Sequence, residues 1–580
     1  MEDEDINTGG QAKNEKIKLD SVYLKGNIVE ELADSNPFVS KESYELLKFH
    51  GSYQGFNRDT ATKLKQGGEQ KEWEFMVRMK CPAGRLTPKQ YLTLDDLCGK
   101  YANNTLRITT RQTFQFHCIV KQNLKKHIAG INEALLSTLG GCGDVVRNIT
   151  CTSAPIKDAV HQKLYADALE IAAHCAPKTS AYHEIWLDGE NVARTSDNDN
   201  LEPLYGKYYL PRKFKIGLAI PEDNSVDVLT NDLAIVLLFK GDVLEGYNIY
   251  IGGGLGMSHN RPATYPRLAT PIAFVKPDEL IQVVEAVIKL QRDHGDRTNR
   301  KHARLKYVVQ EKGQEWTRKT LEEYFGNKMQ DARAIESFKV VDHMGWHEQK
   351  DGKWYLGVPV DSGRIEDNSH VKLRTALREV INKYQLDIIL TPDQNIIFAD
   401  IPADNKAKIT AELKSYGMKL REDITDFHRN FMACVALPTC GLALTEAERV
   451  YVPLVDVIEK VMADCGILNE RISIRIAGCP NGCSRPYVGD IGIVGRMPGH
   501  YALFIGGDFE GTRLNKKIMD RVPYEKLNEV FAVMFGKYVA ERQNGEEFGN
   551  FAHRIGVDKV ALHIEQSLGQ QYKWAKVVTA

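Results

Sequence analysis

The sequence predicts an internally duplicated α+β fold, in which a small α/β unit followed by a larger α/β unit occurs twice. Residues 75–128 and residues 354–408 provide the first observation. Both segments run strand, Gly-Arg turn, helix, strand, short Gln-containing turn, strand and polar helix start. The second observation is that further matching segments follow each copy in the same order. Identity between the copies is low, so their shared order supports the duplication.

The segments that follow each small unit define the larger unit. Each larger unit contains three short motifs of the strand and turn type and then a long amphipathic helix. The pairs, given as first and second copy, are 148–155 and 431–438, 213–221 and 473–482, 247–256 and 501–511, and helices at about 277–293 and 523–543.

Composition restricts the class of protein. The chain has 580 residues, enough for several domains, and its formal net charge of −1 gives no basic surface for nucleic acid. Apolar runs such as residues 233–239 are far too short to span a bilayer. The first residues are acidic and polar and lack the apolar core of a secretory signal, so we expect residues 1–45 to be a disordered tail.

The cysteines indicate a compartment and a site. Eleven cysteines show no disulfide-framework spacing, which predicts a reducing compartment, by default the cytoplasm. Four of them form two close pairs in Pro/Gly-rich turns, Cys434 with Cys440 and Cys479 with Cys483. Four thiolates are the ligand set of one iron–sulfur cluster. Zinc is less favoured because its structural sites usually have C-x2-C spacing, and buried core thiols are the other alternative.

A cationic segment, LRITTRQTFQFHC, distinguishes the first copy from the second. As one continuous strand it would place an apolar face on a core and a row of donors roughly 6.6 Å apart on the other face. Such a row suits a molecule with several carboxylates, because arginine binds carboxylate with a bidentate fork. A solvated strand face is the alternative. The residues expected on the polar face are Arg107, Thr109, Arg111, Thr113, Gln115 and His117.

Two lysines and two arginines are further candidates for anion binding. Lys213 and Lys215 are expected on one face of a strand, where their repulsion would be relieved by a small dianion. Exposed lysines that reach water are the alternative. Arg78 and Arg147 lie in or before predicted strands, where a lone arginine usually forms a surface ion pair.

The glycine-rich stretch at residues 251–256 does not match a dinucleotide-binding fingerprint. We expect it to mark close approach of the backbone to a ligand or to another strand. Because the chain contains no recognisable nucleotide-binding module, electrons would come from a partner protein.

These motifs together resemble the sirohaem-containing assimilatory sulfite and nitrite reductases. The resemblance extends from about residue 40 to the end and includes both cysteine pairs. It also includes RxTxRQxFQxH at 107–117, RNxxCTS at 147–153 and LPRKFK at 210–215. Nitrite enzymes usually have asparagine in place of the second lysine of the K-F-K pair, so Lys215 favours sulfite and nitrite reduction to ammonia is the alternative. A non-enzymatic zinc or iron–sulfur protein is a further alternative.

The resemblance implies six-electron reduction of sulfite to hydrogen sulfide, in assimilatory sulfate reduction and cysteine biosynthesis. Cys434, Cys440, Cys479 and Cys483 would hold one [4Fe–4S] cluster, and Cys483 would also be the axial ligand of sirohaem. Arg78, Arg147, Lys213 and Lys215 would surround the substrate. Contacts with the sirohaem carboxylates would come from Arg107, Thr109, Arg111, Gln115 and His117, and Lys301 and Lys306 would lie near the cofactor. For His117, a hydrogen-bonded core histidine is the alternative.

The resemblance also implies a domain plan and a partner. The expected units are paired ferredoxin-like half-domains at 46–140 and 346–425, a substrate- and sirohaem-binding domain at 141–345, and a cluster-binding domain at 426–580. The electron donor would be a separate protein, an NADPH-dependent flavoprotein alpha subunit in preference to a ferredoxin. The N-terminal segment is a candidate docking site for it, and an inert tail is the alternative.

Overall fold

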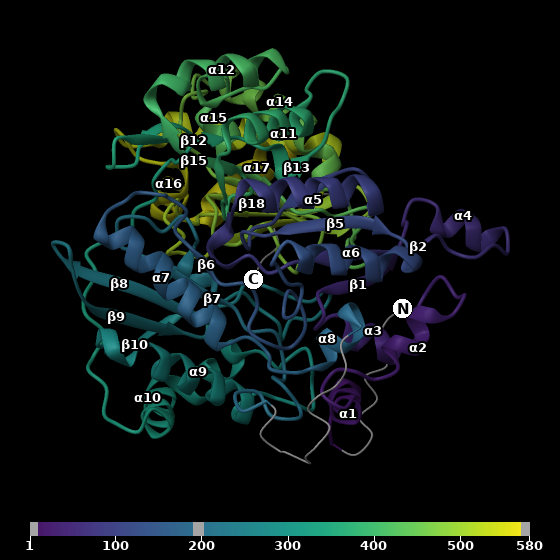
Figure 1. Cartoon of the computed structure of the whole chain (residues 1–580). Helices are drawn as coiled ribbons and strands as arrows, with labels where there is room; N and C mark the ends of the chain where they lie inside the picture. The colour runs from purple at the N-terminus through teal and green to yellow at the C-terminus, as the bar shows by residue number, and fades with distance from the viewer. Residues whose placement is uncertain (1–9, 189–201, 570–580) are drawn as a thin grey trace.

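Figure 1 shows the computed structural model, which describes residues 10–188 and 202–569. The described part contains four five-stranded sheets, two in the small units and two in the larger units. The two sheets of each kind have the same strand connectivity, so the predicted duplication is confirmed. Within these residues, no helix has both the length and the apolar character needed to cross a membrane.

The two small sheets exchange one edge strand each. In spatial order the first consists of β1 (Ser52–Phe56), β2 (Trp73–Arg78), β5 (Phe114–Ile119), β4 (Leu106–Ile108) and β13 (Arg364–Ile365). The second consists of β11 (Gly345–Glu348), β12 (Lys353–Val358), β15 (Ile396–Pro402), β14 (Asp387–Leu390) and β3 (Arg85–Leu86). Strand β13 therefore joins the first sheet and β3 the second, which links the two halves. Their helices are α4 (Ala61–Gln66), α5 (Pro88–Tyr101), α6 (Lys121–Glu133), α11 (Leu373–Tyr384) and α12 (Lys406–Ser415).

Local sequence sets the start of α5 directly after the Gly-Arg turn. Thr87 accepts a hydrogen bond from the Gln90 N–H at 3.2 Å, and Gln90 accepts one from the Thr87 N–H at 3.0 Å. Pro88 occupies the first helical position, where its missing N–H costs nothing. This capping box and the proline explain why the helix begins where the sequence predicts it.

The prediction of one continuous cationic strand is wrong, because β4 and β5 are the two arms of a hairpin. Arg107 pairs with Gln115 across the hairpin. The Thr109 N–H donates to the Thr113 carbonyl at 2.9 Å, and Gln112 has a φ of 52° within the turn. The cationic side chains are therefore positioned by a turn and do not form an alternating row.

The second copy contains the same hairpin turn between β14 and β15. The Thr391 N–H donates to the Asn395 carbonyl at 2.9 Å, and Gln394 has a φ of 68°. Because both turns bend identically, Asp393 occupies the position that Arg111 has in the first copy.

Each larger sheet has three parallel strands followed by two antiparallel ones. The first consists of β6 (Thr150–Cys151), β7 (Ile216–Ala219), β8 (Leu233–Lys240), β9 (Val243–Ile251) and β10 (Thr270–Val275). The second consists of β16 (Phe431–Ala433), β17 (Ile474–Ala477), β18 (Ile491–Met497), β19 (His500–Ile505) and β20 (Lys516–Pro523). Their helices are α7 (Ala159–His174), α8 (Ala181–Leu187), α9 (Leu280–His294), α10 (Leu305–Phe325), α13 (Asp426–Arg429), α14 (Tyr451–Asp464), α15 (Leu527–Glu541), α16 (Phe548–Ile555) and α17 (Val557–Leu568).

The N-terminal segment is folded from residue 10 onward, so the prediction of a disordered tail over residues 1–45 is wrong for this part. It forms α1 (Lys13–Asp20), α2 (Ile28–Ala33) and α3 (Lys41–Leu47). Leu24 and Ile28 are fully buried, because these helices pack against the rest of the protein. Residues 1–9 lie outside the described residues.

Candidate active site

Two neighbouring parallel strands position the four clustered cysteines. Cys434 directly follows β16 and Cys479 follows β17 after one glycine, so both lie at the carboxyl edge of the sheet. The Gly478 N–H donates to the Cys434 sulfur at 3.2 Å. A Cβ at Gly478 would lie 2.6 Å from Cβ of Ala436, so glycine is required for the two cysteine loops to approach each other. Cys440 and Cys483 continue these loops.

The four thiols lie close to one another. Burial and the neighbouring thiols raise the pKa of Cys434 well above its ordinary value and that of Cys479 to about 12. All six pairs among the four thiols interact electrostatically. In residues 10–188 and 202–569, no three His, Cys, Asp or Glu side chains converge closely enough to hold a single metal ion. Thiols that are near one another but spread this widely suit a polynuclear cluster.

Cys483 differs from the other three cysteines in its exposure. Its side chain is exposed although the residues on both sides of it, Gly482 and Ser484, are buried. Cys479 is buried, and Cys434 and Cys440 are partly buried. The open space beside the Cys483 sulfur can therefore accept a second group.

Four cations from three segments lie near one another, and two of them, Arg78 and Lys215, lie near Cys483. Arg78 ends β2, Arg147 precedes β6, and Lys213 and Lys215 precede β7. The Cys483 thiol interacts electrostatically with Arg78 and Lys215. Arg147 interacts in the same way with Lys213. The structure therefore brings together the four residues that the sequence analysis assigned to substrate.

The electrostatics of this cationic group favour a bound anion. Burial lowers the pKa of Lys215 to about 7, and Arg111 and Arg304 add to this effect. Burial, Arg212 and Lys215 hold the pKa of Lys213 well below its ordinary value. Among the described residues, no Asp or Glu forms an ion pair with any of the four cations. An anionic ligand at this position would remove much of the electrostatic cost.

Sequence reasoning missed two groups in the same site. Tyr53 on β1 lies beside Cys142, and burial together with that thiol raises the pKa of Tyr53. Both Tyr53 and Cys142 interact electrostatically with Arg78, and Tyr53 also interacts with Arg147. Tyr53 and Cys142 lie outside the recognised motifs and belong to no charge pattern, so neither could be recognised from the sequence.

Arg111 is held firmly beside the cationic group. Its Nη1 donates to Asn231 Oδ1 at 2.6 Å, and its Nη2 donates to the carbonyls of Ile216, at 2.9 Å, and of Asn148. Its own N–H donates to Thr109 Oγ1 at 3.2 Å. Burial lowers the pKa of Arg111 to about 9, and its Nε is buried without a partner in the described structure. That unpartnered donor fits an anionic cofactor group.

Arg107 is engaged by protein groups. Its Nε donates to Glu448 Oε2 at 2.8 Å, and its Nη2 donates to the Ala433 carbonyl at 3.0 Å. Arg364 donates to the other oxygen of Glu448 at 2.5 Å. The hydrogen bond to Ala433 joins the cationic hairpin to the residue that precedes Cys434, so in this structure Arg107 links the two halves of the site.

Gln115 and His117 connect Arg78 in the site with Arg364 of the second copy. In the amide orientation that satisfies its neighbours, Gln115 accepts a hydrogen bond from Arg78 Nε at 3.0 Å. In the same orientation the Gln115 amide nitrogen donates to His117 Nε2 at 3.2 Å, and His117 Nδ1 lies 3.1 Å from Arg364 Nη1. Burial and the adjacent arginines hold the pKa of His117 well below its ordinary value. The structure thus shows the hydrogen-bonded core histidine that the sequence analysis kept as an alternative.

The two other lysines differ in their surroundings. Lys306 is fully buried, and its ammonium donates to the carbonyls of Gly254 at 3.2 Å and Gly256 at 2.9 Å. It therefore supports the glycine-rich loop. Lys301 is partly buried, and its backbone N–H donates to Asn299 Oδ1 at 3.1 Å.

The glycine-rich loop makes the close backbone approach that the sequence predicts. A Cβ at Gly253 would lie 2.2 Å from the Leu229 carbonyl. The Met257 N–H donates to the Pro480 carbonyl at 3.0 Å, so this loop also contacts the turn between Cys479 and Cys483. The loop therefore belongs to the wall of the site.

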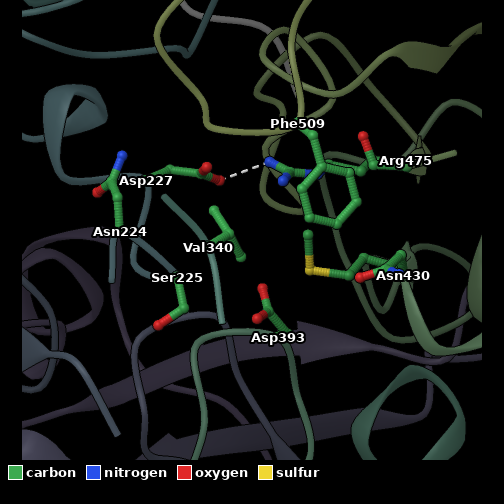
Figure 2. Close-up of a pocket in the computed structure, with 10 residues that line it drawn as sticks. Asn224, Ser225, Asp227, Val340, Asp393, Asn430, Arg475 and Phe509 are labelled. Carbon is green, nitrogen blue, oxygen red and sulfur yellow. Dashed lines mark hydrogen bonds and ion pairs between the residues drawn. The ribbon is translucent and has the colours of Figure 1, made fainter. Parts of the chain in front are cut away.

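Figure 2 shows a polar cavity that is lined by residues of both copies. Asp393, the counterpart of Arg111, lines it together with Asp227 and Arg475. Asp227 forms an ion pair with Arg475 at 2.5 Å, and Arg485 Nε lies 2.8 Å from the same carboxylate. The charges that line this cavity are paired within the protein, whereas the four cations of the first copy have no such ion pairs among the described residues.

The fold and site define a class: an oxidoreductase built from two copies of one unit, with a thiolate-bound cluster beside an anion site. Two family models match the chain. The description "Nitrite and sulphite reductase 4Fe-4S domain" matches residues 168–329 and 425–572, and "Nitrite/Sulfite reductase ferredoxin-like half domain" matches residues 68–134 and 347–416. The chain belongs to the nitrite and sulfite reductase family.

The similarity to known proteins covers nearly the whole chain. A protein of Paenibacillus sp. (strain JDR-2) is 42% identical over 547 residues, covering 94% of this chain and 95% of its own. A protein of Geobacillus kaustophilus (strain HTA426) is also 42% identical over 547 residues, covering 94% of this chain and 96% of its own. Both are named sulfite reductase (NADPH) hemoprotein beta-component. The structure of the Mycobacterium tuberculosis NirA protein has the same fold, with a TM-score of 0.76, 23% identity and coverage of 94% and 97% of the two chains.

Proposed function

We propose that this chain is the haem-bearing component of an assimilatory sulfite reductase and reduces sulfite to hydrogen sulfide with six electrons. It binds one sirohaem and one [4Fe–4S] cluster. The observation that carries the proposal is the group of four cations, unpaired within the described residues, that faces an exposed thiol of the cluster site. The names of the relatives favour sulfite over nitrite.

We assign the cluster to Cys434, Cys440, Cys479 and Cys483, and the exposed sulfur of Cys483 would also hold the sirohaem iron. The buried, unpartnered Nε of Arg111 supports its assignment to a cofactor carboxylate. The contacts of Arg107 with Glu448 and of Lys306 with backbone carbonyls support positioning roles for those two side chains beside the cofactor. The remaining assigned contacts with the cofactor are Thr109, Gln115 and Lys301, and His117 is assigned a supporting role behind Gln115.

The cations of the site bind the substrate and stabilise the charge that develops on it. The sirohaem and the cluster, when bound, would supply the six electrons. Arg78 and Arg147 keep their charge throughout, since guanidinium does not deprotonate in proteins, and so orient the anion. Lys213 and Lys215 have lowered pKa values. Their ammonium groups can therefore donate hydrogen bonds to the bound anion and transfer a proton to its oxygen as an S–O bond breaks.

The electron donor is a separate protein, and we propose an NADPH-dependent flavoprotein subunit in preference to a ferredoxin. The names of the relatives support this choice. A cytoplasmic location is supported by the cysteines, all eleven of which lie in the described residues and are free of disulfides.

Turnover with two oxyanions tests the proposal. The purified holoenzyme is supplied with a chemical reductant and either sulfite or nitrite, and sulfide and ammonia are measured. We expect kcat/KM to be larger for sulfite, because two ammonium groups suit a dianion better than a singly charged anion. A much larger kcat/KM for nitrite would assign the chain to nitrite reduction. Absence of a haem absorbance band in well-expressed protein would reject both.

A further inference from the structure

Lys18, on the buried face of the N-terminal helix α1, contacts both loops that carry cations of the anion site. Lys18 on α1 is 2% exposed. Its ammonium donates to the Leu210 carbonyl at 2.8 Å and lies 3.7 Å from Asp144 Oδ2. Asp144 is three residues before Arg147, and Leu210 is three residues before Lys213. One side chain thus joins the two loops.

The two loops are also joined by main-chain hydrogen bonds. The Leu210 N–H donates to the Asp144 carbonyl at 3.0 Å, and the Phe214 N–H donates to the Val145 carbonyl at 3.1 Å. The Arg147 N–H in turn donates to the Phe214 carbonyl at 2.8 Å. A shift at the Lys18 end is therefore transmitted to both cation positions.

The carboxylates around Lys18 keep other partners, so its removal does not leave a carboxylate alone. Arg300 binds both oxygens of Asp144, at 2.6 and 3.0 Å. Glu15 pairs with Lys18 at 2.5 Å and also with Arg297. Replacement of Lys18 is therefore expected to preserve the fold while loosening the contact between α1 and the two loops.

We propose that Lys18 is a positioning residue, which holds the loops of Arg147 and Lys213 in the relative placement that binds the substrate anion. The N-terminal segment then serves the anion site itself, in addition to any contact with an electron donor. This inference rests on the proposed sulfite reduction. It gives a reason for burying an ammonium group in a segment whose composition is that of a tail.

The test compares Lys18→Met with Lys16→Met, which removes a lysine from the exposed side of the same helix. Both holoenzymes are assayed with a chemical reductant, so that donor docking plays no part. A misplacement of a binding group by about 1 Å can lower the rate by up to about a hundredfold. Because Lys18→Met removes a single contact with the loops, we expect a smaller effect, a rise in the sulfite KM of about tenfold. Lys16→Met should behave as the parent.

Binding of carbon monoxide to the reduced haem separates positioning from general damage, because this ligand is uncharged. We expect Lys18→Met to bind it as the parent does, and Lys18→Arg to recover most of the sulfite affinity. Should Lys18→Met not accumulate, Lys18→Gln takes its place, since it can still donate to Leu210 without the charge.

The inference is overturned if the sulfite KM of Lys18→Met stays within about twofold of the parent's, well below the effect expected from such a misplacement. It is also overturned if Lys18→Met loses sulfite binding and carbon monoxide binding equally. The parent enzyme in the same assay tests the proposed function separately. Sulfide formation by the parent with no effect of Lys18→Met rejects only the positioning role, whereas absence of sulfide formation by the parent rejects the proposed function.

Discussion

Replacing Lys215 by Met tests the anion site at the lysine whose pKa shift allows the expected effect to be calculated. Burial lowers the pKa of Lys215 from 10.5 to about 7. At about 1.36 kcal/mol for each pH unit, the charged form is disfavoured by roughly 5 kcal/mol before an anion binds. A bound dianion recovers part of this energy. Loss of one such charged donor typically costs about 10²–10³ in rate, so we expect kcat/KM for sulfite to fall about a hundredfold.

The assay follows sulfide formation and reductant oxidation by the holoenzyme, with cofactor content checked by absorbance. Lys240→Met is the control, because it removes an exposed lysine from the far end of β8 in the same larger sheet. Lys215→Met should keep the parent's cofactor content. A change in kcat/KM of less than about threefold, far below that expected for a charged donor at the reacting group, would refute the assignment of Lys215 to the substrate.

Three further predictions follow from the geometry. Lys215 loses its proton as the pH rises through about 7, so the KM for sulfite should rise between pH 6 and pH 8. This pH dependence should be weaker in Lys215→Met. The titration of sulfite itself affects both enzymes equally. Cys440→Ser should lose the iron and acid-labile sulfide of the cluster, whereas Cys465→Ser, at a cysteine outside the four, should retain them; equal contents in both would contradict the ligand set. Glu448→Gln leaves Arg107 and Arg364 without their shared carboxylate. It should lower the free energy of unfolding by about 3–5 kcal/mol. The control is Glu446→Gln, which breaks the exposed ion pair with Arg449 and should lower the free energy of unfolding by less than about 1 kcal/mol.

The duplication and the cysteine site were predictable because local signals encode both. The Gly-Arg turn, the helix start at Thr87 and the buried strands recur in order, and ligand cysteines occur in recognisable turns. The hairpin in the cationic segment was not predictable in this way. Its turn places Gln112 in the left-handed region without the glycine or asparagine that usually marks such a position.

Long-range contacts account for the other failures. Lys18 and Glu15 are charged residues in a polar segment, and only their distant partners, Asp144 and Arg297, make their burial possible. Tyr53 and Cys142 likewise become part of the site through the folding of separate segments. Arg107 illustrates the same limit, because the sequence showed a cation and could not show that Glu448 neutralises it.

The electronic relation between the two cofactors is the most direct test of the whole account. If the Cys483 sulfur belongs to both centres, Mössbauer and electron paramagnetic resonance spectra of the purified holoenzyme will show haem iron and cluster iron as one magnetically coupled system. Spectra in which the haem and the cluster behave as independent centres, in protein that holds both, would contradict the shared thiolate.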